Sequence, residues 1–479
     1  MKTMKAAHQT GKTIAIIGGG VSGALTAYHL ARHHIAARIV VIDPRPRLGL
    51  GLAYSTPSLR HLLNVPAGKI SALPGEPSHF LNWLRSNYDP QATPETFAPR
   101  QIFGRYIAAL VDQTAAIEHL EDTVVDYHSN ASGATLHLGD GSDLHADIVV
   151  LATGNFDPAT LPGISDEAIA SGHYRHNAWL PDTFDDLAPD APVVLIGSGL
   201  TGVDVLLRLR ELGHRGMVTA ISRHGGFPNR HASYTPIAQA AIPAGTPATC
   251  VAYLKAFHAT LRSGADWRAA VDSLRATTND LWLALSTAEQ QRFRRHLQRR
   301  WEVVRHRMAP PIADVIEAEL AAGTLVLRRG HLDRVDGRSA GAKVTMRTSK
   351  NEDGREVIDA ARVINCTGPS MNYRRVDSPL LQSLFAQGLA TAGPLGAGFN
   401  STIDGALIGV NGLASETAFT LGPGRLGTLL ESIAIPEIRE QAVRVAVLIA
   451  SHPAMLASPA TLTVQPPANL AMQSAAVAW

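Results

Sequence analysis

The chain has 479 residues, of which 45% are hydrophobic and 18% charged, and its 43 basic and 41 acidic residues leave a net charge of +2. This composition is ordinary for a globular protein of two or three domains, and it excludes a small disulfide scaffold and extensive disorder. A net charge so close to zero provides no field to hold a polyanion, so nucleic acid is not an expected partner.

The cysteines and the hydropathy of the sequence indicate in which cellular compartment the protein is expected. The two cysteines, Cys250 and Cys366, form no CxxC motif, so we expect neither a disulfide framework nor a dithiol redox centre. The apolar run 14–17 is too short for the core of a signal peptide. No window approaches the ~20 apolar residues that a membrane helix needs. We therefore expect a cytoplasmic protein without a membrane partner.

The first ordered unit is predicted at residues 13–17, a β-branched run typical of a strand buried on both faces. The glycine motif GGGVSG follows at 18–23, then a helix over 21–35 and a second strand over 38–42 that ends at Asp43. This order favours a dinucleotide site, because the glycines allow close approach of a pyrophosphate and the carboxylate accepts hydrogen bonds from a ribose. The predicted ligands are Gly18, Gly20, Ser22, Gly23 and Asp43.

The same pattern recurs at residues 192–221, with a strand at 192–196, the motif GSGLTG at 197–202, a helix at 203–212 and a strand at 217–221. Here the second strand leads into Ser222, Arg223 and His224 instead of an acid. A basic side chain can bind a 2′-phosphate, so the site is expected to prefer NADPH. The alternative is a set of surface basic residues without a cofactor preference. The predicted ligands are Gly197, Gly199, Thr201, Gly202, Ser222, Arg223 and His224.

Two further strands, at 147–151 and 362–365, run into glycine turns at Gly154 and Gly368, which look like matching exits toward a nucleotide. Residues 236–322 show helical spacing and are expected to form a helical insertion, and 458–473 a loosely packed tail. The predicted fold class is α/β with two Rossmann-like dinucleotide-binding domains. We expect an FAD domain in two parts, 1–180 and 335–479, around an NADPH domain at 181–334.

Two dinucleotide sites in one chain make chemical sense as a tightly held flavin reduced by a diffusible nicotinamide, here FAD and NADPH. The order of the two glycine motifs and of the turns at 152–154 and 366–368 resembles the two-dinucleotide-binding-domain flavoproteins. More segments resemble one bacterial FAD/NAD(P)-binding family related to flavin-dependent N-hydroxylating monooxygenases, such as an aspartate N-monooxygenase that forms nitrosuccinate. They are GLGLAY at 49–54, HLLNVPA at 61–67, HFLNWL at 79–84, SRHG at 222–225 and LGP at 421–423.

This resemblance implies FAD on Gly18, Gly20, Gly23 and Asp43, and a flavin ring near residues 61–67, where Asn64 is the candidate catalytic polar group. It also implies that Gly422 and Pro423 return to the flavin. The expected reaction is NADPH-dependent hydroxylation of the nitrogen of a small amine or amino acid by molecular oxygen, through a flavin hydroperoxide. The alternatives are an NAD(P)H:acceptor oxidoreductase and a non-enzymatic FAD-binding redox sensor.

Two weaker patterns complete the sequence. His29 and His33 have the spacing of a helical metal pair but lack a third ligand, so no metal site is expected. A basic run between Arg292 and Arg307 is either a solvated helix face or a site for phosphate or an acidic substrate. A homo-oligomer is possible on this sequence, which carries no signal for the oligomeric state.

Overall fold

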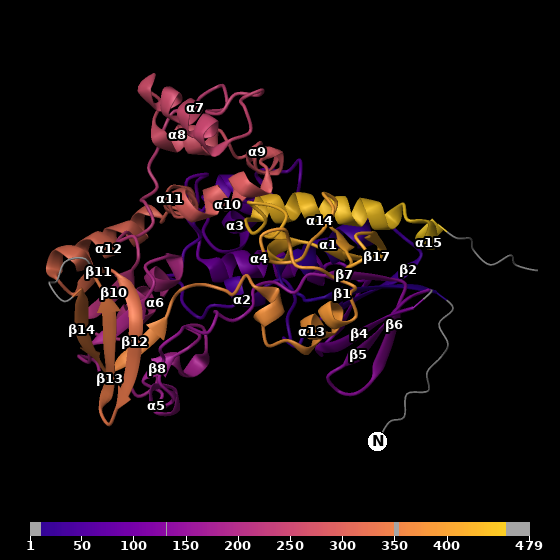
Figure 1. The fold of residues 1–479 in the computed structure, drawn as a ribbon. Helices are drawn as coiled ribbons and strands as arrows, with labels where there is room; N and C mark the ends of the chain where they lie inside the picture. Colours follow the sequence, from indigo (N-terminus) through magenta and orange to yellow (C-terminus); the bar gives the residue numbers. More distant parts are fainter. Residues whose placement is uncertain (1–10, 131, 349–353, 457–479) are drawn as a thin grey trace, which may run out of the picture.

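The computed structural model describes residues 11–130, 132–348 and 354–456. Two units lie side by side in Figure 1, each built on its own parallel sheet, with a group of helices projecting above them. The tail expected at 458–473 lies outside the described residues. Within those residues, no helix is both long and apolar enough to cross a membrane.

The first unit contains a six-stranded sheet in the order β16-β17-β7-β1-β2-β3. Strands β1, β2 and β7 are buried almost throughout, which is why their sequences are continuous β-branched and apolar runs. All neighbours pair in parallel except β16 and β17. The strands are β1 (Lys12–Ile17), β2 (Ala37–Ile42), β3 (Ile117–Leu120), β7 (Ile148–Leu151), β16 (Ala406–Ile408) and β17 (Ala414–Thr420).

The second unit contains a five-stranded parallel sheet in the order β11-β10-β9-β15-β8. Its central strands β9 and β15 are entirely buried. The strands are β8 (Tyr174–Arg175), β9 (Val193–Ile196), β10 (Val218–Ser222), β11 (Leu325–Arg329) and β15 (Arg362–Asn365).

Each unit also carries a three-stranded antiparallel meander, inserted before the strand that ends in a glycine turn. The meander of the first unit is β4 (Val124–Asn130), β5 (Gly133–Leu138) and β6 (Asp143–Ala146), and it precedes β7. The meander of the second unit is β12 (His331–Arg338), β13 (Gly341–Arg347) and β14 (Arg355–Ala360), and it precedes β15. The two units therefore share one architecture.

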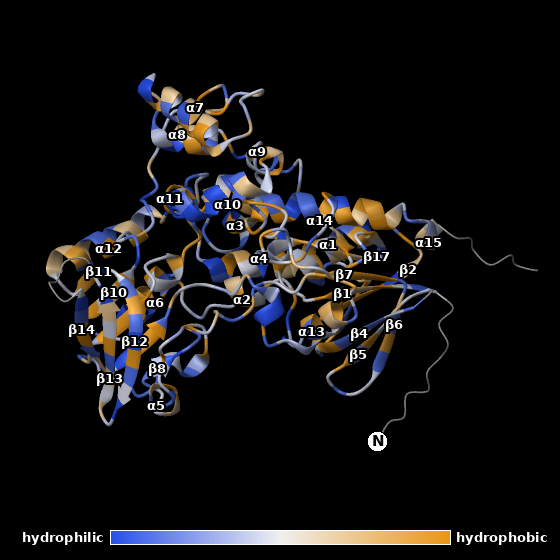
Figure 2. Ribbon diagram, in the orientation of Figure 1, coloured by the Kyte–Doolittle hydropathy of each residue, from blue (hydrophilic) through white to orange (hydrophobic). Residues whose placement is uncertain are grey.

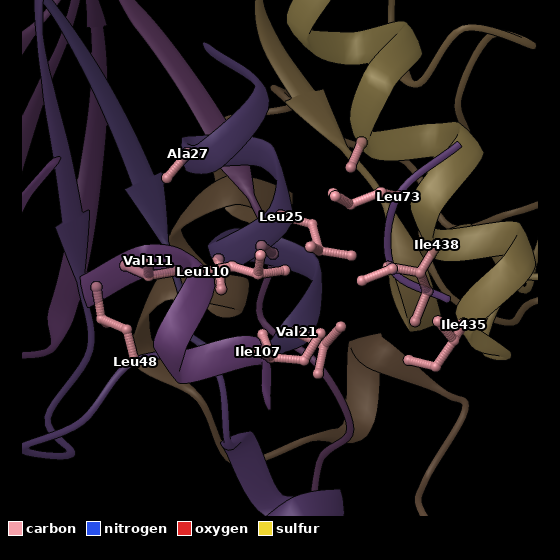
Figure 3. Close-up of a cluster of buried hydrophobic side chains, with 14 of the residues drawn as sticks. Val21, Leu25, Ala27, Leu48, Leu73, Ile107, Leu110, Val111, Ile435 and Ile438 are labelled. Carbon is pink, nitrogen blue, oxygen red and sulfur yellow. The ribbon is translucent and has the colours of Figure 1, made fainter. Parts of the chain in front are cut away.

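Three helices from distant parts of the chain form the main core of the first unit: α1 (Val21–Arg32), α4 (Arg100–Asp112) and α14 (Ile435–Ala450). Figure 3 shows Leu25 of α1, Ile107 of α4 and Ile438 of α14 pointing toward one another. Burial of a side chain of this size contributes about 1.5–3 kcal/mol. The C-terminal segment is thus held against the helix that follows the first glycine motif.

Shorter helices join these elements. In and around the first unit they are α2 (Gly51–Tyr54), η1 (Ala67–Lys69), α3 (His79–Asn87), η3 (Tyr373–Arg375), α13 (Pro379–Ala386), η4 (Gly422–Arg425) and α15 (Pro453–Leu456). In the second unit they are α5 (Asp166–Ala170), η2 (Pro181–Phe184) and α6 (Leu200–Glu211).

The helical insertion forms between β10 and β11, as the helical spacing predicted. Figure 1 shows α7 and α8 projecting from the body, and Figure 2 shows that α10 and α11 are mainly hydrophilic. The helices are α7 (Cys250–Arg262), α8 (Trp267–Asp272), α9 (Thr278–Ala284), α10 (Thr287–His296), α11 (Gln298–Arg305) and α12 (Pro310–Ala322).

The expected domain ranges were 1–180, 181–334 and 335–479. The two sheets place the boundaries between the units at other positions. Strand β8 at 174–175 and the elements from β12 to β15, at 331–365, lie with the second sheet. The chain rejoins the first unit only after β15. Boundaries of this kind depend on pairing between distant strands, which local sequence does not encode.

Candidate functional site

The two glycine motifs make the same tight turn. Gly18 and Gly197, which follow β1 and β9, have φ values of +103° and +118°. A Cβ atom at Gly18 would lie 2.3 Å from the carbonyl oxygen of Ala152, and one at Gly197 would lie 2.6 Å from that of Cys366. Both positions therefore require glycine for the backbone conformation and for the approach of the next strand.

The third glycine of each motif serves helix packing. A Cβ atom at Gly23 would lie 1.9 Å from the carbonyl oxygen of Gly18, and one at Gly202 would lie 2.6 Å from that of Gly197. These glycines let α1 and α6 cross closely over the turns that precede them. The same close contact between a glycine turn and the following helix thus occurs twice in the chain.

The middle glycines differ, because the protein itself leaves room for a side chain there. A Cβ atom at Gly20 would meet nothing closer than the Cα of Gly51 at 3.5 Å, and one at Gly199 would meet nothing within 4 Å. Both residues cap a helix whose first turn has no side-chain cap and no acid. The open space and the free N–H groups fit a dinucleotide pyrophosphate at each helix N-terminus.

Asp43 lies at the end of β2, beside the first glycine motif. Its carboxylate is 5% exposed and accepts hydrogen bonds from the backbone N–H groups of Gly19 at 2.7 Å and Arg45 at 2.9 Å. These contacts fix the carboxylate next to the pyrophosphate cradle, where the sequence predicted a ribose ligand.

The corresponding end of β10 is cationic. Ser222 is buried, and its hydroxyl accepts a hydrogen bond from the N–H of Gly225 at 3.3 Å, whereas Arg223 and His224 are exposed. Strand β11 ends beside it, with Arg329 in register with Ser222. The pKa of His224 is lowered by partial burial and by its cationic neighbours, which include Arg223, Arg299, Arg329 and His331.

We call Arg223, Arg299 and Arg329, which surround His224, the cationic rim. Arg299 donates a hydrogen bond to the carbonyl oxygen of Gly226 at 3.2 Å and lies 3.7 Å from Glu302. Across the described parts of the chain, no carboxylate forms an ion pair with Arg223 or Arg329. The rim can therefore hold a phosphate. Arg299 belongs to the basic run that was a candidate phosphate site, but its place beside the second glycine motif was not predicted. Arg329 was not predicted, because it comes from β11, far from the motif in sequence.

A cavity of about 310 Å³ lies between the two units. Three predicted residues, Asn64, Thr201 and Gly368, line it. Arg223 and His224 lie at the end of β10 and do not. Other lining residues are Tyr54 and Phe156 of the first unit, Trp179 and Asn365 of the second, His306 of the insertion, and Ile433.

Direct contacts join the units beside this cavity. Arg100, the first residue of α4, donates two hydrogen bonds to the carboxylate of Asp204 in α6, at 2.6 and 3.1 Å. Ring atom Nε2 of His61 lies 2.9 Å from the Asp204 carbonyl oxygen, and Nε2 of His231 lies 3.1 Å from the Asn64 carbonyl oxygen. Burial lowers the pKa of both histidines, that of His231 to about 4.

His306 reaches the cavity from the loop after α11. Its Nε2 atom is buried and has no hydrogen-bond partner among the described residues, and its pKa is lowered, mainly by burial. It is therefore a neutral ring at pH 7 with an unused polar atom. His306 belongs to the basic run between Arg292 and Arg307, but the sequence did not place it at a cavity.

The neighbours of His306 in the basic run have internal ion-pair partners. Arg305 is 5% exposed and lies 3.5 Å from both Glu431 and Glu437, and Arg307 is 2% exposed and pairs with Asp272. These two arginines anchor the loop internally. Arg292, Arg295 and Arg300 are exposed, as the solvated-face interpretation expects.

The remaining predicted residues lie around the first motif and the strand exits. Gly422 is buried with a φ of +67°, and a Cβ atom there would lie 2.5 Å from the hydroxyl of Ser22. Pro423 follows it in the buried turn η4. The C-terminal segment thus returns to the first glycine motif. Gly154 and Gly368 have φ values of +70° and +84°, with open space beside each.

Comparison with known proteins agrees with this geometry. Residues 15–156 match the sequence model of a family described as FAD-NAD(P)-binding. No curated protein matches the sequence significantly.

Three solved structures share the fold at low identity. The ornithine N-hydroxylase of Kutzneria sp. 744, with reduced FAD, NADP⁺ and L-ornithine, is 14% identical with a TM-score of 0.63, covering 92% of this chain and 99% of its own. The FAD-bound cadaverine monooxygenase of Erwinia amylovora is 13% identical with a TM-score of 0.63, covering 97% and 100%. The bacillithiol disulfide reductase of Bacillus cereus is 16% identical with a TM-score of 0.54, covering 92% and 99%.

The fold is therefore common to enzymes of different chemistry. The aspartate N-monooxygenase of the sequence resemblance stays an analogy. Residues 15–156 match an FAD-NAD(P)-binding family model, and the chain as a whole shares the α/β fold of these solved structures.

Proposed function

We propose that this protein is an FAD-dependent monooxygenase that consumes NADPH and hydroxylates the nitrogen of a small amine or amino acid. The observation that carries the proposal is the pairing of two open pyrophosphate cradles, at Gly20 and Gly199, in two units that share one cavity. Two of the structural relatives, an ornithine N-hydroxylase and a cadaverine monooxygenase, support the choice of nitrogen as the site of oxidation.

FAD fits the first cradle. The N-terminus of α1 would hold its pyrophosphate, Asp43 its ribose, and Ser22, Gly422 and Pro423 would lie close by. When bound, FAD supplies the transfer of electrons and the activation of oxygen, which no side chain of the protein can supply.

NADPH fits the second cradle, with its pyrophosphate at the N-terminus of α6 and its 2′-phosphate in the cationic rim. An aspartate at the end of β10, like Asp43 in the first unit, would repel that phosphate. Arg223 and Arg329 have no carboxylate partner among the described residues, so binding a phosphate there breaks no existing ion pair.

The cavity residues have three tasks in this reaction. The contacts of Arg100 with Asp204 and of His231 with Asn64 hold the units together and limit entry of water. Asn64, the residue proposed as catalytic, can orient a bound ring or substrate through its side-chain amide. The unpartnered Nε2 of the neutral His306 can accept a hydrogen bond from the substrate amine, which must lose its proton before it reacts.

A disulfide reductase shares the fold, and the cysteines weigh against that function here. The chain has only Cys250 and Cys366, both buried and free. Burial raises the pKa of Cys250 to about 11 and that of Cys366 higher still, so neither is a ready thiolate. The remaining alternatives are an oxidoreductase that passes electrons to an acceptor and an FAD-binding sensor.

The test is to load the purified protein with FAD and to measure NADPH oxidation and oxygen consumption against a panel of amines and amino acids. A product that has gained one oxygen atom on nitrogen, formed in proportion to the NADPH consumed, supports the proposal. Flavin reduction followed by transfer to a quinone or dye, without oxygenated product from any amine, identifies the acceptor oxidoreductase. Absence of flavin reduction by NADPH identifies the sensor. Gly199→Ala is the matched control, since it should keep FAD and lose the response to NADPH.

A further inference from the structure

The meander of the first unit carries a row of polar side chains outside the dinucleotide sites. Asp126 of β4 is in register with His137 of β5, and His137 is in register with Asp143 of β6. Residues in register on neighbouring strands project from the same face of a sheet. His128 lies two residues beyond Asp126 on the same strand, so it projects from that face as well.

Three of these side chains meet at one point. One potential ligand atom from each of Asp126, His128 and His137 lies within 4.8 Å of the others. Nε2 of His128 is 2.9 Å from a carboxylate oxygen of Asp126, and the two imidazole rings have centroids 5.0 Å apart. Two imidazoles and one carboxylate form a ligand set that suits Zn²⁺ and related transition-metal ions, whereas Mg²⁺ prefers oxygen ligands alone.

We propose that Asp126, His128 and His137 form a binding site for a divalent transition-metal ion, for which Zn²⁺ is the probe. Water would complete the coordination, because all three side chains are partly exposed, with exposed fractions of 36%, 54% and 38%. The site is separate from the dinucleotide cradles and does not depend on the proposed reaction.

The neighbours of these ligands orient them through hydrogen bonds. The carboxylate of Asp143 accepts a hydrogen bond from Nδ1 of His137, which leaves the lone pair on Nε2 for the metal. A metal-binding histidine usually donates its other ring N–H to such an acceptor. Asp143 thus selects the tautomer of His137 that can bind.

The carboxylate of Asp126 is also held by hydrogen bonds, from α13 and from the backbone of β4. The hydroxyl of Ser383 in α13 donates a hydrogen bond to its carboxylate, as does the backbone N–H of Tyr127 at 2.8 Å. These bonds fix the position of the carboxylate on the face of the meander. A metal bound here would therefore connect β4 and β5 to each other and, through Ser383, to α13.

The test uses the full-length protein loaded with FAD, freed of metal by a chelator and titrated with Zn²⁺ in competition with a chromogenic chelator. We expect one zinc ion per chain. His128→Ala and His137→Ala should each weaken zinc binding at least about tenfold, and Asp143→Asn should weaken it roughly 10- to 100-fold without removing a ligand. His33→Ala is the matched control. His33 is exposed and forms, with His29, the helical pair whose spacing resembles that of metal ligands.

The outcomes separate clearly. Loss of zinc binding in the two histidine variants with full binding in His33→Ala supports the site, provided that each variant retains its FAD. Zinc affinity that is unchanged in His137→Ala, or reduced equally in His33→Ala, overturns it, as does absence of stoichiometric zinc in the unmodified protein. Should either alanine variant fail to fold, Asp143→Asn decides, since an unchanged affinity there also contradicts the proposal.

Discussion

The two dinucleotide-binding units have the same turn and opposite charge. In both, the first and third glycines are required by the protein's own backbone, and the middle glycine leaves open space at a helix N-terminus. The units differ where the second strand ends, with a buried aspartate at position 43 and exposed Arg223 and His224 at the other site. The two units thus share a backbone turn and differ in the side chains at the strand ends, where we propose that the choice between FAD and NADPH is made.

The largest expected effect comes from filling the open space in each cradle. Gly20→Ala should fold, since the nearest protein atom is 3.5 Å away, but should weaken FAD binding by about 10- to 100-fold, the equivalent of an overpacking cost of ~1–3 kcal/mol. Gly199→Ala should leave FAD in place and weaken NADPH binding by a similar factor. Flavin content and NADPH titration measure the two effects. Equal loss of both cofactors in either variant would contradict the assignment of one cofactor to each unit.

Substitution of Asp43 tests the proposed FAD site of the first unit alone. Asp43→Ala loses the hydrogen bonds to Gly19 and Arg45 as well as the proposed ribose contact, so FAD retention should fall by about tenfold or more, in line with ~1.5–3 kcal/mol for a hydrogen bond to a charged group. Asp43→Asn keeps an acceptor and should lose less. The measurement is the fraction of FAD that survives gel filtration. Unchanged occupancy in both variants would contradict the proposed FAD site.

Substitution of Arg223 tests the proposed NADPH site of the second unit alone. Arg223→Ala should raise the KM for NADPH by about fivefold, because an exposed ion pair with phosphate contributes on the order of 1 kcal/mol. The KM for NADH, which lacks the 2′-phosphate, should stay the same. Arg329→Ala should act in the same direction if the cationic rim is one site. An equal rise for both coenzymes would remove the argument for a phosphate site.

The smallest effect concerns the contact between the units. The pKa of His231 is lowered from 6.5 to about 4, chiefly by burial and then by Arg307. As the pH falls from 6.5 toward 4, the unfolded chain binds this proton before the folded chain does, so folding stability decreases over that window. His231→Asn keeps a donor for the Asn64 carbonyl and should reduce the pH dependence. Urea unfolding at about pH 7 and about pH 5 measures it, and identical dependence in the two proteins would show that His231 contributes nothing.

Local sequence was sufficient for the elements that are buried on both faces. The predicted strands at 13–17, 38–42, 192–196 and 362–365 agree with β1, β2, β9 and β15 to within about one residue at most ends, because continuous β-branched runs between glycines have few other solutions. The glycine turns at Gly154 and Gly368 were predictable for the same reason. The meanders were not, since their short strands are half exposed and show no continuous apolar run.

The cavity was predictable only in part. Asn64 and Thr201 could be proposed from motifs, and their contacts with ligands stay predictions. Arg329 and the pair Arg100–Asp204 became apparent only in three dimensions, because each is brought to the site by a strand pairing or a helix contact between distant segments. The same holds for the row from Asp126 to Asp143, which requires the register of three strands.

The ion pair between Arg100 and Asp204 has a consequence for energetics. Asp204 lies in α6, and Arg100 opens α4, which packs on α1. The helices that begin at the two cradles, α1 and α6, are thus connected through α4, which contacts both of them. If occupancy of one cradle alters the affinity at the other through this connection, thermodynamic linkage requires that the factor be the same in both directions.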